Sequence, residues 1–338
     1  MSGAQVSDSD AVRVAVIGAG GWGEQHARIF SKRPDTELVA VVGRNREKTD
    51  ARAAAYDSRG FIDVDEMLDA VDPNLVSVCL PNEQHFEVTR HLLARGIPLL
   101  VEKPLVFSLA EADQLLEIAA AGNVFFGINF NHRFAEPVQR ALAAVREGQL
   151  GDPVFATWRF GGEANYGDSP HANLIETQCH GLDLLELFFG PIASVMAQMT
   201  NKTYGAYSTI AVALEFENRA VGTMLGSYDS SYAYPDSQLV ELSGTLGRAV
   251  IHDTVRSLSL QLAGDEVAHV WQAGYFNDEA RYFAGTFDRH VDRLIPALRT
   301  GAPPPVPAAA GRRALELAGA IIRSHETGER VATVGGSR

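Results

Sequence analysis

Three glycines near the start of the chain have the spacing of a phosphate-binding loop. They lie in the stretch VRVAVIGAGGWGEQHARIF, directly after the apolar run Val12–Ile17. In such a loop the first glycine permits a tight turn, the second lets the backbone approach a pyrophosphate, and the third lets the following helix sit close to the strand. The N-terminus of that helix then faces the phosphates. We expect a dinucleotide site that uses Gly18, Gly20, Gly21, Trp22 and Gly23.

The second expected strand, Leu38–Val42, ends without the acidic residue that binds the ribose 2′-hydroxyl in NAD sites. Gly43 stands in its place and Arg44 follows. A glycine leaves space, and an arginine can pair with a 2′-phosphate. The sequence therefore predicts a preference for NADP(H), with NAD(H) possible. The alternative is that Arg44 is a solvated loop cation.

Two further segments carry groups suited to proton transfer. Glu102-Lys103-Pro104 ends the expected strand Pro98–Val101, and ligands of a parallel sheet bind at that edge. Glu176 and His180 are four residues apart and Asp183 is three further on, so an uninterrupted α-helix would place all three on one face. The alternative for Lys103 is that it is an ordinary exposed lysine. The alternative for His180 is that it is a core residue whose hydrogen-bonding group is paired with Asp183.

The elements that must position these groups follow two patterns. Up to Ile128, short apolar strands alternate with amphipathic helices, which indicates a parallel sheet covered on both faces. After Asn129, strand-like runs with alternating apolar and polar residues are typical of an antiparallel sheet. We expect helices at Leu174–Phe189, Asp278–Arg299 and Gly311–Thr327. The predicted order is a disordered tail (1–10), a Rossmann dinucleotide-binding domain (11–128) and an α+β domain (129–332).

Composition excludes several classes of protein. Of 338 residues, 46% are apolar and 21% are charged, which is a globular balance. The net charge of −13 argues against a nucleic-acid surface. No apolar run approaches the ~20 residues that cross a bilayer, and the polar start has no secretory signal. Cys79 and Cys179 form neither a disulfide framework nor a zinc motif. We expect a cytoplasmic protein that binds neither nucleic acid nor membrane.

Together these motifs resemble the Gfo/Idh/MocA oxidoreductase family, which includes glucose–fructose oxidoreductase and inositol dehydrogenases. The resemblance runs from Val12 to about Val331 and is most specific at Glu102-Lys103-Pro104 and at Glu176–Asp183. It implies an α/β fold in which the Rossmann domain precedes an α+β domain with a large open, mostly antiparallel sheet. It also implies an enzyme that transfers a hydride between a nicotinamide cofactor and a hydroxyl or carbonyl of a sugar, cyclitol or related small molecule.

The resemblance assigns roles residue by residue. It implies that Lys103 contacts nicotinamide and substrate and assists proton transfer, and that Glu102 helps to hold the cofactor. His180 matches the residue that binds the reacting hydroxyl, and Glu176 stands where the family has Asp. Further cofactor contacts are Pro81, Asn82 and His85. Further substrate contacts are Asn131, Arg133 and, on a polar segment, Arg159.

We favour His180 as the general acid/base, because its ordinary pKa is about 6.5, and Lys103 is close behind. A homodimer or homotetramer should form through the open sheet, no metal should take part, and the substrate should be polyhydroxylated. Two interpretations of other classes stay open. One is a glycosidase that works by transient oxidation with tightly held nucleotide, and the other is a non-catalytic nucleotide sensor.

Overall fold

The computed structural model describes residues 11–81, 84–162, 169–203 and 205–333, so the predicted tail at 1–10 lies outside the described residues. The chain folds into two compact units. The first unit comprises Met1–Phe130 and Phe287–Arg312, and the second comprises Asn131–Thr286 and Arg313–Arg338. The second segment of the first unit lies between the two segments of the second unit, so the chain crosses between the units three times.

The first unit contains a parallel sheet of six strands in the order β3-β2-β1-β4-β5-β6. Its strands are β1 (Val12–Ile17), β2 (Thr36–Val42), β3 (Arg59–Phe61), β4 (Leu75–Val78), β5 (Leu99–Val101) and β6 (Phe126–Ile128). Its helices are α1 (Gly21–Lys32), α2 (Arg46–Ala55), α3 (Val64–Val71), α4 (His85–Ala94), α5 (Leu109–Ala121) and α9 (Gly285–Thr300). The strand order reverses beside β1, which is where such sheets bind nucleotides.

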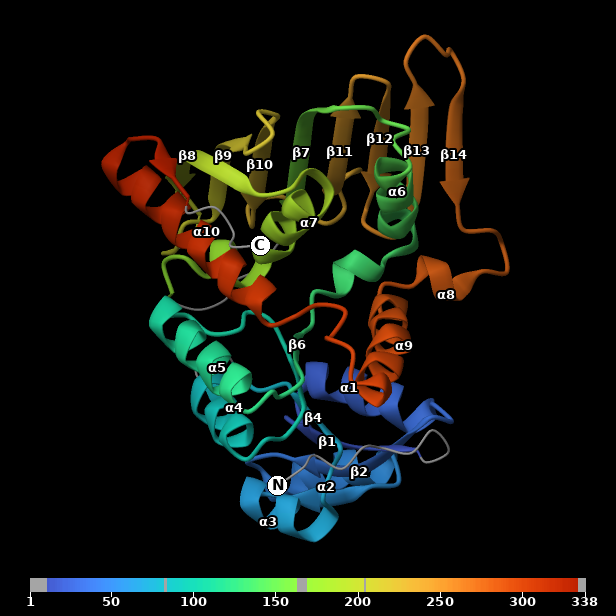
Figure 1. Cartoon of the computed structure of the whole chain (residues 1–338), viewed down its shortest axis with the longest axis vertical. Coiled ribbons are helices and arrows are strands. Elements are labelled where there is room, and N and C mark those ends of the chain that lie inside the picture. Colours follow the sequence, from blue (N-terminus) through green and yellow to red (C-terminus); the bar gives the residue numbers. More distant parts are fainter. Residues whose placement is uncertain (1–10, 82–83, 163–168, 204, 334–338) are drawn as a thin grey trace. The chain divides into compact units, whose positions relative to one another are not determined.

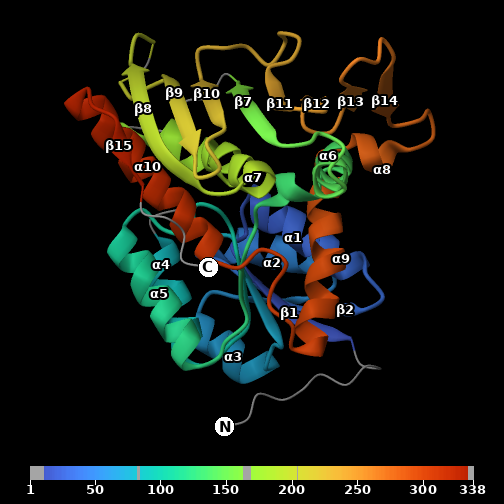
Figure 2. The same cartoon turned by 45° about the horizontal axis from the view of Figure 1, so that its top comes forward.

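Burial explains why these strands are short and apolar. Every residue of β4, β5 and β6 is buried, because helices cover both faces of the sheet. Helices α4 and α5 lie side by side on one side of it, while α1 and α9 lie on the other (Figures 1 and 2). The predicted parallel sheet is therefore confirmed.

Helix α9 belongs to the first unit, whereas the sequence places it in the domain 129–332. Polar contacts account for the difference. The Arg28 guanidinium donates to the Asp288 carboxylate at 2.8 Å, Arg33 pairs with Asp292, and Arg299 donates to the Asp35 carbonyl at 3.1 Å. These partners are more than 250 residues apart, so no local pattern could indicate them.

The second unit contains a sheet of nine strands in the order β14-β13-β12-β11-β7-β10-β9-β8-β15. Its strands are β7 (Pro153–Gly161), β8 (Ile192–Thr200), β9 (Thr209–Phe216), β10 (Val221–Ser227), β11 (Gln238–Gly244), β12 (Gly247–His252), β13 (Ser257–Leu262), β14 (Ala268–Gln272) and β15 (Val331–Ala332). Neighbouring strands are antiparallel except β7 and β10. Its helical segments are η2 (Asn131–Phe134), α6 (Glu136–Arg146), η3 (Asn173–Thr177), α7 (Cys179–Phe189), α8 (Asp278–Arg281) and most of α10 (Ala309–Thr327).

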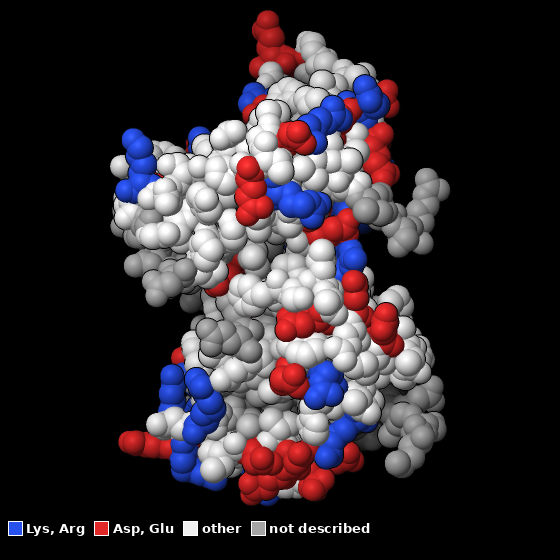
Figure 3. Space-filling model, turned by 90° about the vertical axis from the view of Figure 1, so that its left-hand side faces the viewer, with Lys and Arg blue, Asp and Glu red and all other residues white. Residues whose placement is uncertain are grey.

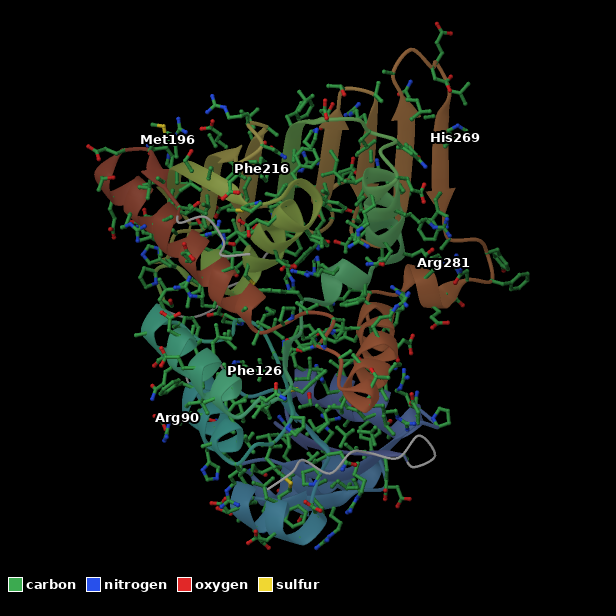
Figure 4. The ribbon with its side chains drawn as sticks, in the orientation of Figure 1. Arg90, Phe126, Met196, Phe216, His269 and Arg281 are labelled. Atoms are coloured by element: carbon green, nitrogen blue, oxygen red, sulfur yellow. The ribbon has the colours of Figure 1, made fainter. Side chains whose placement is uncertain are left out.

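Helices α6 and α7 lie on the same face of this sheet (Figures 1 and 2). Residues alternate between that face and the opposite one. Phe216 of β9 is fully buried and its ring packs 5.6 Å from that of Phe189, whereas Met196 of β8 is 49% exposed (both labelled in Figure 4). One face therefore forms the core and the other carries exposed apolar side chains, as an antiparallel sheet permits.

Two expected helices are wrong in detail. Leu174–Phe189 is interrupted, because the N–H of Gln178 donates to the carbonyl of Asn173 and makes a π turn before α7. The Gln178 amide also donates to the Asn173 side-chain oxygen at 3.0 Å, which holds that turn. Asp278–Arg299 is likewise divided into α8 and α9. The sequence also missed the short elements β3, α3, β14 and β15.

Acidic and basic side chains are interspersed on the face drawn in Figure 3. Pairs elsewhere on the surface include Arg90 with Glu87 at 2.9 Å and Arg140 with Glu136 at 2.8 Å. Such surface pairs contribute less than about 1 kcal/mol each, so apolar burial is the main source of stability within each unit. In the described part of the chain, no helix has the length and apolar character that spanning a membrane requires.

Candidate functional site

The glycine loop joins β1 to α1 and has the geometry that a dinucleotide needs. Gly18 has a φ of +128°, and a Cβ there would lie 2.3 Å from the Cys79 carbonyl oxygen. A Cβ on Gly23 would lie 1.7 Å from the carbonyl oxygen of Gly18, so α1 approaches the loop closely only because position 23 is glycine. At Gly20 and Gly21 a Cβ would meet nothing within 4 Å. The backbone there is open to a phosphate at the N-terminus of α1.

Beside this loop, Trp22 is 51% exposed and stacks on Phe287 with ring centroids 5.6 Å apart. Arg44 follows β2 and is exposed, and it has no hydrogen bond or ion pair with any residue that the structure describes. Gly43 is closely packed, because a Cβ would lie 2.5 Å from Thr49 Oγ1. Position 43 therefore has no room for an acidic side chain in this conformation.

Three residues that follow β4 in the sequence were expected to contact the cofactor, and the last of them, His85, begins α4. Pro81 is exposed, and Asn82 lies outside the described residues. His85 is 1% exposed, and its ring nitrogens lie 2.8 Å from the Leu80 carbonyl oxygen and 3.0 Å from that of Pro104. Burial lowers the pKa of His85. Its ring thus joins the loop after β4 to the turn after β5 and does not point outward.

Glu102 and Lys103 follow β5, and Lys103 is half-buried. The side chain of Glu102 is turned inward, where its carboxylate accepts from His26 Nε2 and from Asn129 Nδ2, both at 2.7 Å. Although burial opposes its charged form, His26 and Asn129 lower the pKa of Glu102. The carboxylate is thus engaged by the protein's own donors, and the contact between Glu102 and a cofactor stays a prediction.

His180 is 6% exposed and lies near the start of α7. The next residue, Gly181, lets α7 rest on β7, since a Cβ there would lie 2.4 Å from the Trp158 ring nitrogen. The Trp158 Nε1 donates to Gln178 Oε1 at 2.8 Å, just before the helix begins. The imidazole of His180 stacks face to face on that of His132, with centroids 4.0 Å apart and an interplanar angle of 16°.

Asp183 lies on α7 three residues after His180, so the two share a face. The carboxylate of Asp183 pairs bidentately with Arg133, whose Nε donates at 2.7 Å. Although burial opposes its charge, Asp183 raises the pKa of Arg133. Glu176 lies in the π turn before α7, so a continuous α-helix does not run from Glu176 to Asp183. That Glu176 shares a face with His180 stays a prediction.

The expected substrate contacts are separated by the fold. Asn131 is 3% exposed and its amide donates to Thr286 Oγ1 at 2.7 Å. Arg159 lies on β7 next to Trp158, so the two side chains point to opposite faces of the sheet. The Arg159 guanidinium donates to the Asp236 carbonyl at 2.6 Å. Arg133 is engaged with Asp183. The second unit therefore brings together Arg133, Asp183, His132 and His180, and it places Arg159 apart from them.

Comparison with known proteins identifies the family. Residues 12–130 match the model described as "Oxidoreductase family, NAD-binding Rossmann fold", and residues 138–250 match the GFO/IDH/MocA C-terminal domain. The chain belongs to the GFO/IDH/MocA oxidoreductase family.

Two curated relatives and one solved structure illustrate the range of this family. The chain is 35% identical to D-glucoside 3-dehydrogenase of Escherichia coli over 153 residues, which is 45% of this chain and 44% of that protein. It is 23% identical to inositol 2-dehydrogenase of Rhizobium meliloti over 329 residues, 93% of this chain and 96% of the relative. Levoglucosan dehydrogenase in complex with NADH has the same fold, with a TM-score of 0.87, 17% identity and coverage of 96% and 100%.

The predicted family membership, fold class and NAD-binding oxidoreductase activity are thereby confirmed. The GFO/IDH/MocA chain also contains buried polar residues that the sequence analysis missed: Ser77, His26, Asn129, His290 and His132. His26 lies on the buried side of α1 among apolar residues, and a lone histidine in such a pattern carries no signal of its role.

Among the described residues, no three His, Cys, Asp or Glu side chains gather as metal ligands would. Metal-free chemistry stays a prediction.

Proposed function

We propose that this protein oxidises or reduces a CH–OH group of a sugar, a glycoside or a cyclitol with a nicotinamide cofactor. One observation carries the proposal. The glycine loop follows β1 and Lys103 follows β5, and β4 pairs with both strands. The loop and Lys103 therefore lie at the same edge of the parallel sheet, two strands or about 10 Å apart. The names of three relatives, which mention a glucoside, inositol and levoglucosan, support this class of substrate.

The open backbone at Gly20 and Gly21 fits a pyrophosphate, with Trp22 beside it. When bound, the nicotinamide ring would accept or return the hydride. Two variants, Gly20→Ala and Gly23→Ala, distinguish a role of the loop in binding the pyrophosphate from its role in packing α1. Gly23→Ala should disrupt folding, because its Cβ has no space. Gly20→Ala should fold normally and weaken cofactor binding, measured by fluorescence titration. Wild-type affinity in Gly20→Ala would contradict the phosphate site.

We further propose that NADP(H) is preferred over NAD(H). The exposed Arg44 can pair with a 2′-phosphate, and the packed Gly43 excludes the carboxylate that would bind a ribose hydroxyl. Arg44→Ala should weaken kcat/KM for NADP by roughly 1.5–3 kcal/mol and that for NAD much less. Arg46→Ala is the matched control, because Arg46 is exposed nearby and pairs with Asp50 at 3.6 Å. Equal losses for both cofactors in Arg44→Ala would refute the preference.

Side chains of the protein must accept or donate the proton of the reacting hydroxyl. In the oxidation direction the carbinol carbon loses a hydride and the hydroxyl oxygen loses a proton, which leaves a carbonyl. We propose that His180 takes that proton and that Lys103 hydrogen-bonds the same oxygen and shares the transfer. Glu176 would bind a substrate hydroxyl close to His180. In this proposal Asn131 and Arg133 act by holding η2, and Arg159 makes no substrate contact.

The test is turnover with a panel of sugars, cyclitols and chromogenic glycosides. Lys103→Ala and His180→Ala should each lower kcat by roughly 10²–10⁴-fold, while cofactor binding survives. Lys48→Ala is the control, because Lys48 is an exposed lysine on α2 of the same unit. Near-wild-type turnover in both site variants would refute the roles. Release of the chromogenic group without net reduction of cofactor would instead support the glycosidase interpretation.

We also propose that a second copy of the chain covers the open face of the nine-stranded sheet. That face carries exposed apolar side chains on both sides of β9, among them Met196 on β8 and Val221 and Leu225 on β10, at 49%, 55% and 41% exposure. Contiguous exposed apolar surface is typical of an interface. Light scattering should give a dimer or tetramer, and Leu225→Lys should shift it toward monomer. A wild-type monomer at micromolar concentration would contradict the proposal.

A further inference from the structure

A chain of hydrogen bonds runs through buried side chains next to the turn that carries Lys103. His26 Nδ1 lies 2.8 Å from Ser77 Oγ, and His26 Nε2 donates to Glu102. Asn129 donates to the same Glu102 oxygen, and its own oxygen lies 2.8 Å from His290 Nδ1. All five side chains belong to residues that are at most 5% exposed. This series of hydrogen bonds connects α1, β4, α9 and the ends of β5 and β6.

Glu102 is the centre of this arrangement. Its carboxylate accepts from His26, from Asn129 and, at 3.2 Å, from the backbone N–H of Lys103. A carboxylate only accepts, so His26 Nε2 must carry a proton. With its other nitrogen at Ser77, the ring of His26 is held at both ends. The position of the Lys103 backbone is therefore coupled to a histidine on the helix of the glycine loop.

The charges of the pair agree with this geometry. Burial opposes the charged form, but the Cys79 sulfur and the Glu102 carboxylate raise the pKa of His26 to about 10. Glu102 is shifted in the opposite direction, so the two groups form a buried ion pair. A buried ion pair is a weak source of stability, since well-packed apolar residues often serve as well. The location of this pair beside Lys103 calls for another explanation.

We propose that His26 is a positioning residue, which holds Glu102 and through it fixes the turn that presents Lys103 to the substrate. This inference rests on the proposed role of Lys103. It also links the two ends of the cofactor site, because His26 lies on the helix that begins at the glycine loop. A single buried bond then sets the lysine relative to the loop.

Kinetics test the proposal through three variants. His26→Phe keeps the size of the ring and removes the donor, and we expect kcat to fall about 10²-fold while the Kd for the cofactor changes little. His26→Gln has an amide that can donate to Glu102 in place of Nε2, and it should recover most of the lost kcat. His91→Gln is the matched control, because His91 pairs with Asp65 at 2.8 Å on the exposed side of α4. It should behave as wild type.

A spectroscopic readout does not depend on turnover. The chain has only four lysines, Lys32, Lys48, Lys103 and Lys202, so protein labelled with [ε-13C]lysine gives four resonances. Lys103→Arg assigns the resonance of Lys103. We expect His26→Phe to move that resonance and leave the other three in place, and His91→Gln to move none. A role in folding alone would lower stability without moving the Lys103 resonance of the folded protein.

The outcomes separate this inference from the function on which it rests. An unchanged Lys103 resonance in folded His26→Phe overturns the positioning role. If His26→Phe does not fold, the isosteric Glu102→Gln takes its place and must move the same resonance, or the inference fails. Wild-type turnover in Lys103→Ala would refute the proposed function, and the resonance would still test whether His26 positions the lysine.

Discussion

Each unit buries a histidine beside a residue that we propose for proton transfer, but the surroundings of the two histidines differ. In the first unit, His26 has Ser77 and Glu102 at its ring nitrogens, and the contacts are hydrogen bonds and charge. In the second unit, His132 lies flat against His180 and edge-on to Phe283, whose centroid is 5.3 Å away. Lys103 is thus placed by an ion pair, and His180 by ring packing. The first arrangement should respond to pH and the second to side-chain shape.

The largest expected effect concerns the ion pair beside the stacked rings. Arg133 and Asp183 join η2 to α7, and Asp183 is 7% exposed. Asp183→Asn leaves the guanidinium without its charged partner, so we expect a loss of about 3–5 kcal/mol in the free energy of unfolding. Urea unfolding measures it.

Glu87→Gln is the control for that prediction. It makes the same carboxylate-to-amide change in the exposed pair with Arg90, which Figure 4 labels on α4. The control should cost less than about 1 kcal/mol. If the two variants lose the same amount, Arg133 and Asp183 do not clamp the second unit.

The next effect is a pH dependence specific to the first unit. The pKa of His26 rises from 6.5 in the unfolded chain to about 10 in the folded one. Its contribution is therefore complete below pH 6.5 and is lost as the pH rises through about 10. Over that range the stability of wild type should fall more steeply than that of His26→Gln, by roughly 1 kcal/mol per pH unit. Urea midpoints of both proteins at several alkaline pH values measure the difference.

The contribution of Glu102 to stability depends on pH in the opposite direction. Its pKa lies below 4.5, so its contribution is present above that value and is lost on acidification. The pair therefore stabilises the first unit most between the two unfolded-state pKa values, 4.5 for Glu102 and 6.5 for His26. Parallel stability curves for wild type and His26→Gln at alkaline pH would show that His26 is not charged in the folded protein.

The smallest expected effect tests shape in the second unit. His132→Ala removes the ring against which His180 stacks, and we expect kcat to fall about tenfold because the imidazole is less well oriented. His132→Phe keeps a flat ring among Trp158, Phe160 and Phe283, so the loss should be smaller. Steady-state kinetics at saturating cofactor compare them. An equal loss in both variants would mean that a ring nitrogen of His132 matters and the stacking does not.

Sequence reasoning succeeded where the signal is local. The strand β1, the glycine loop and α1 are consecutive, and their spacing alone indicates the turn that Gly18 and Gly23 make. The parallel sheet follows from short apolar strands between helices. The helix 174–189 was predicted as continuous because no pattern marks a π turn, which depends on the buried bond between Gln178 and Asn173.

Partners remote in sequence account for the rest. Glu102 was expected at the cofactor because of the family resemblance, and the side chains that donate to it are 76 and 27 residues away. Arg133 was expected in the pocket, but it binds Asp183, 50 residues away. In each case the sequence shows a polar side chain, while the partner of that side chain depends on which elements pack together.

What the sequence by itself determined about this protein is its family, its two kinds of sheet, and the residues that meet a ligand through the backbone of one loop. The conformational freedom of a glycine and the periodicity of a strand act within a few residues, so both can be predicted from the sequence without the fold. Only the tertiary structure decided that α9 returns to the first unit, that Glu102 faces His26 and that His180 stacks on His132. Side chains on distant segments find their partners through packing, and packing is a property of the whole folded unit.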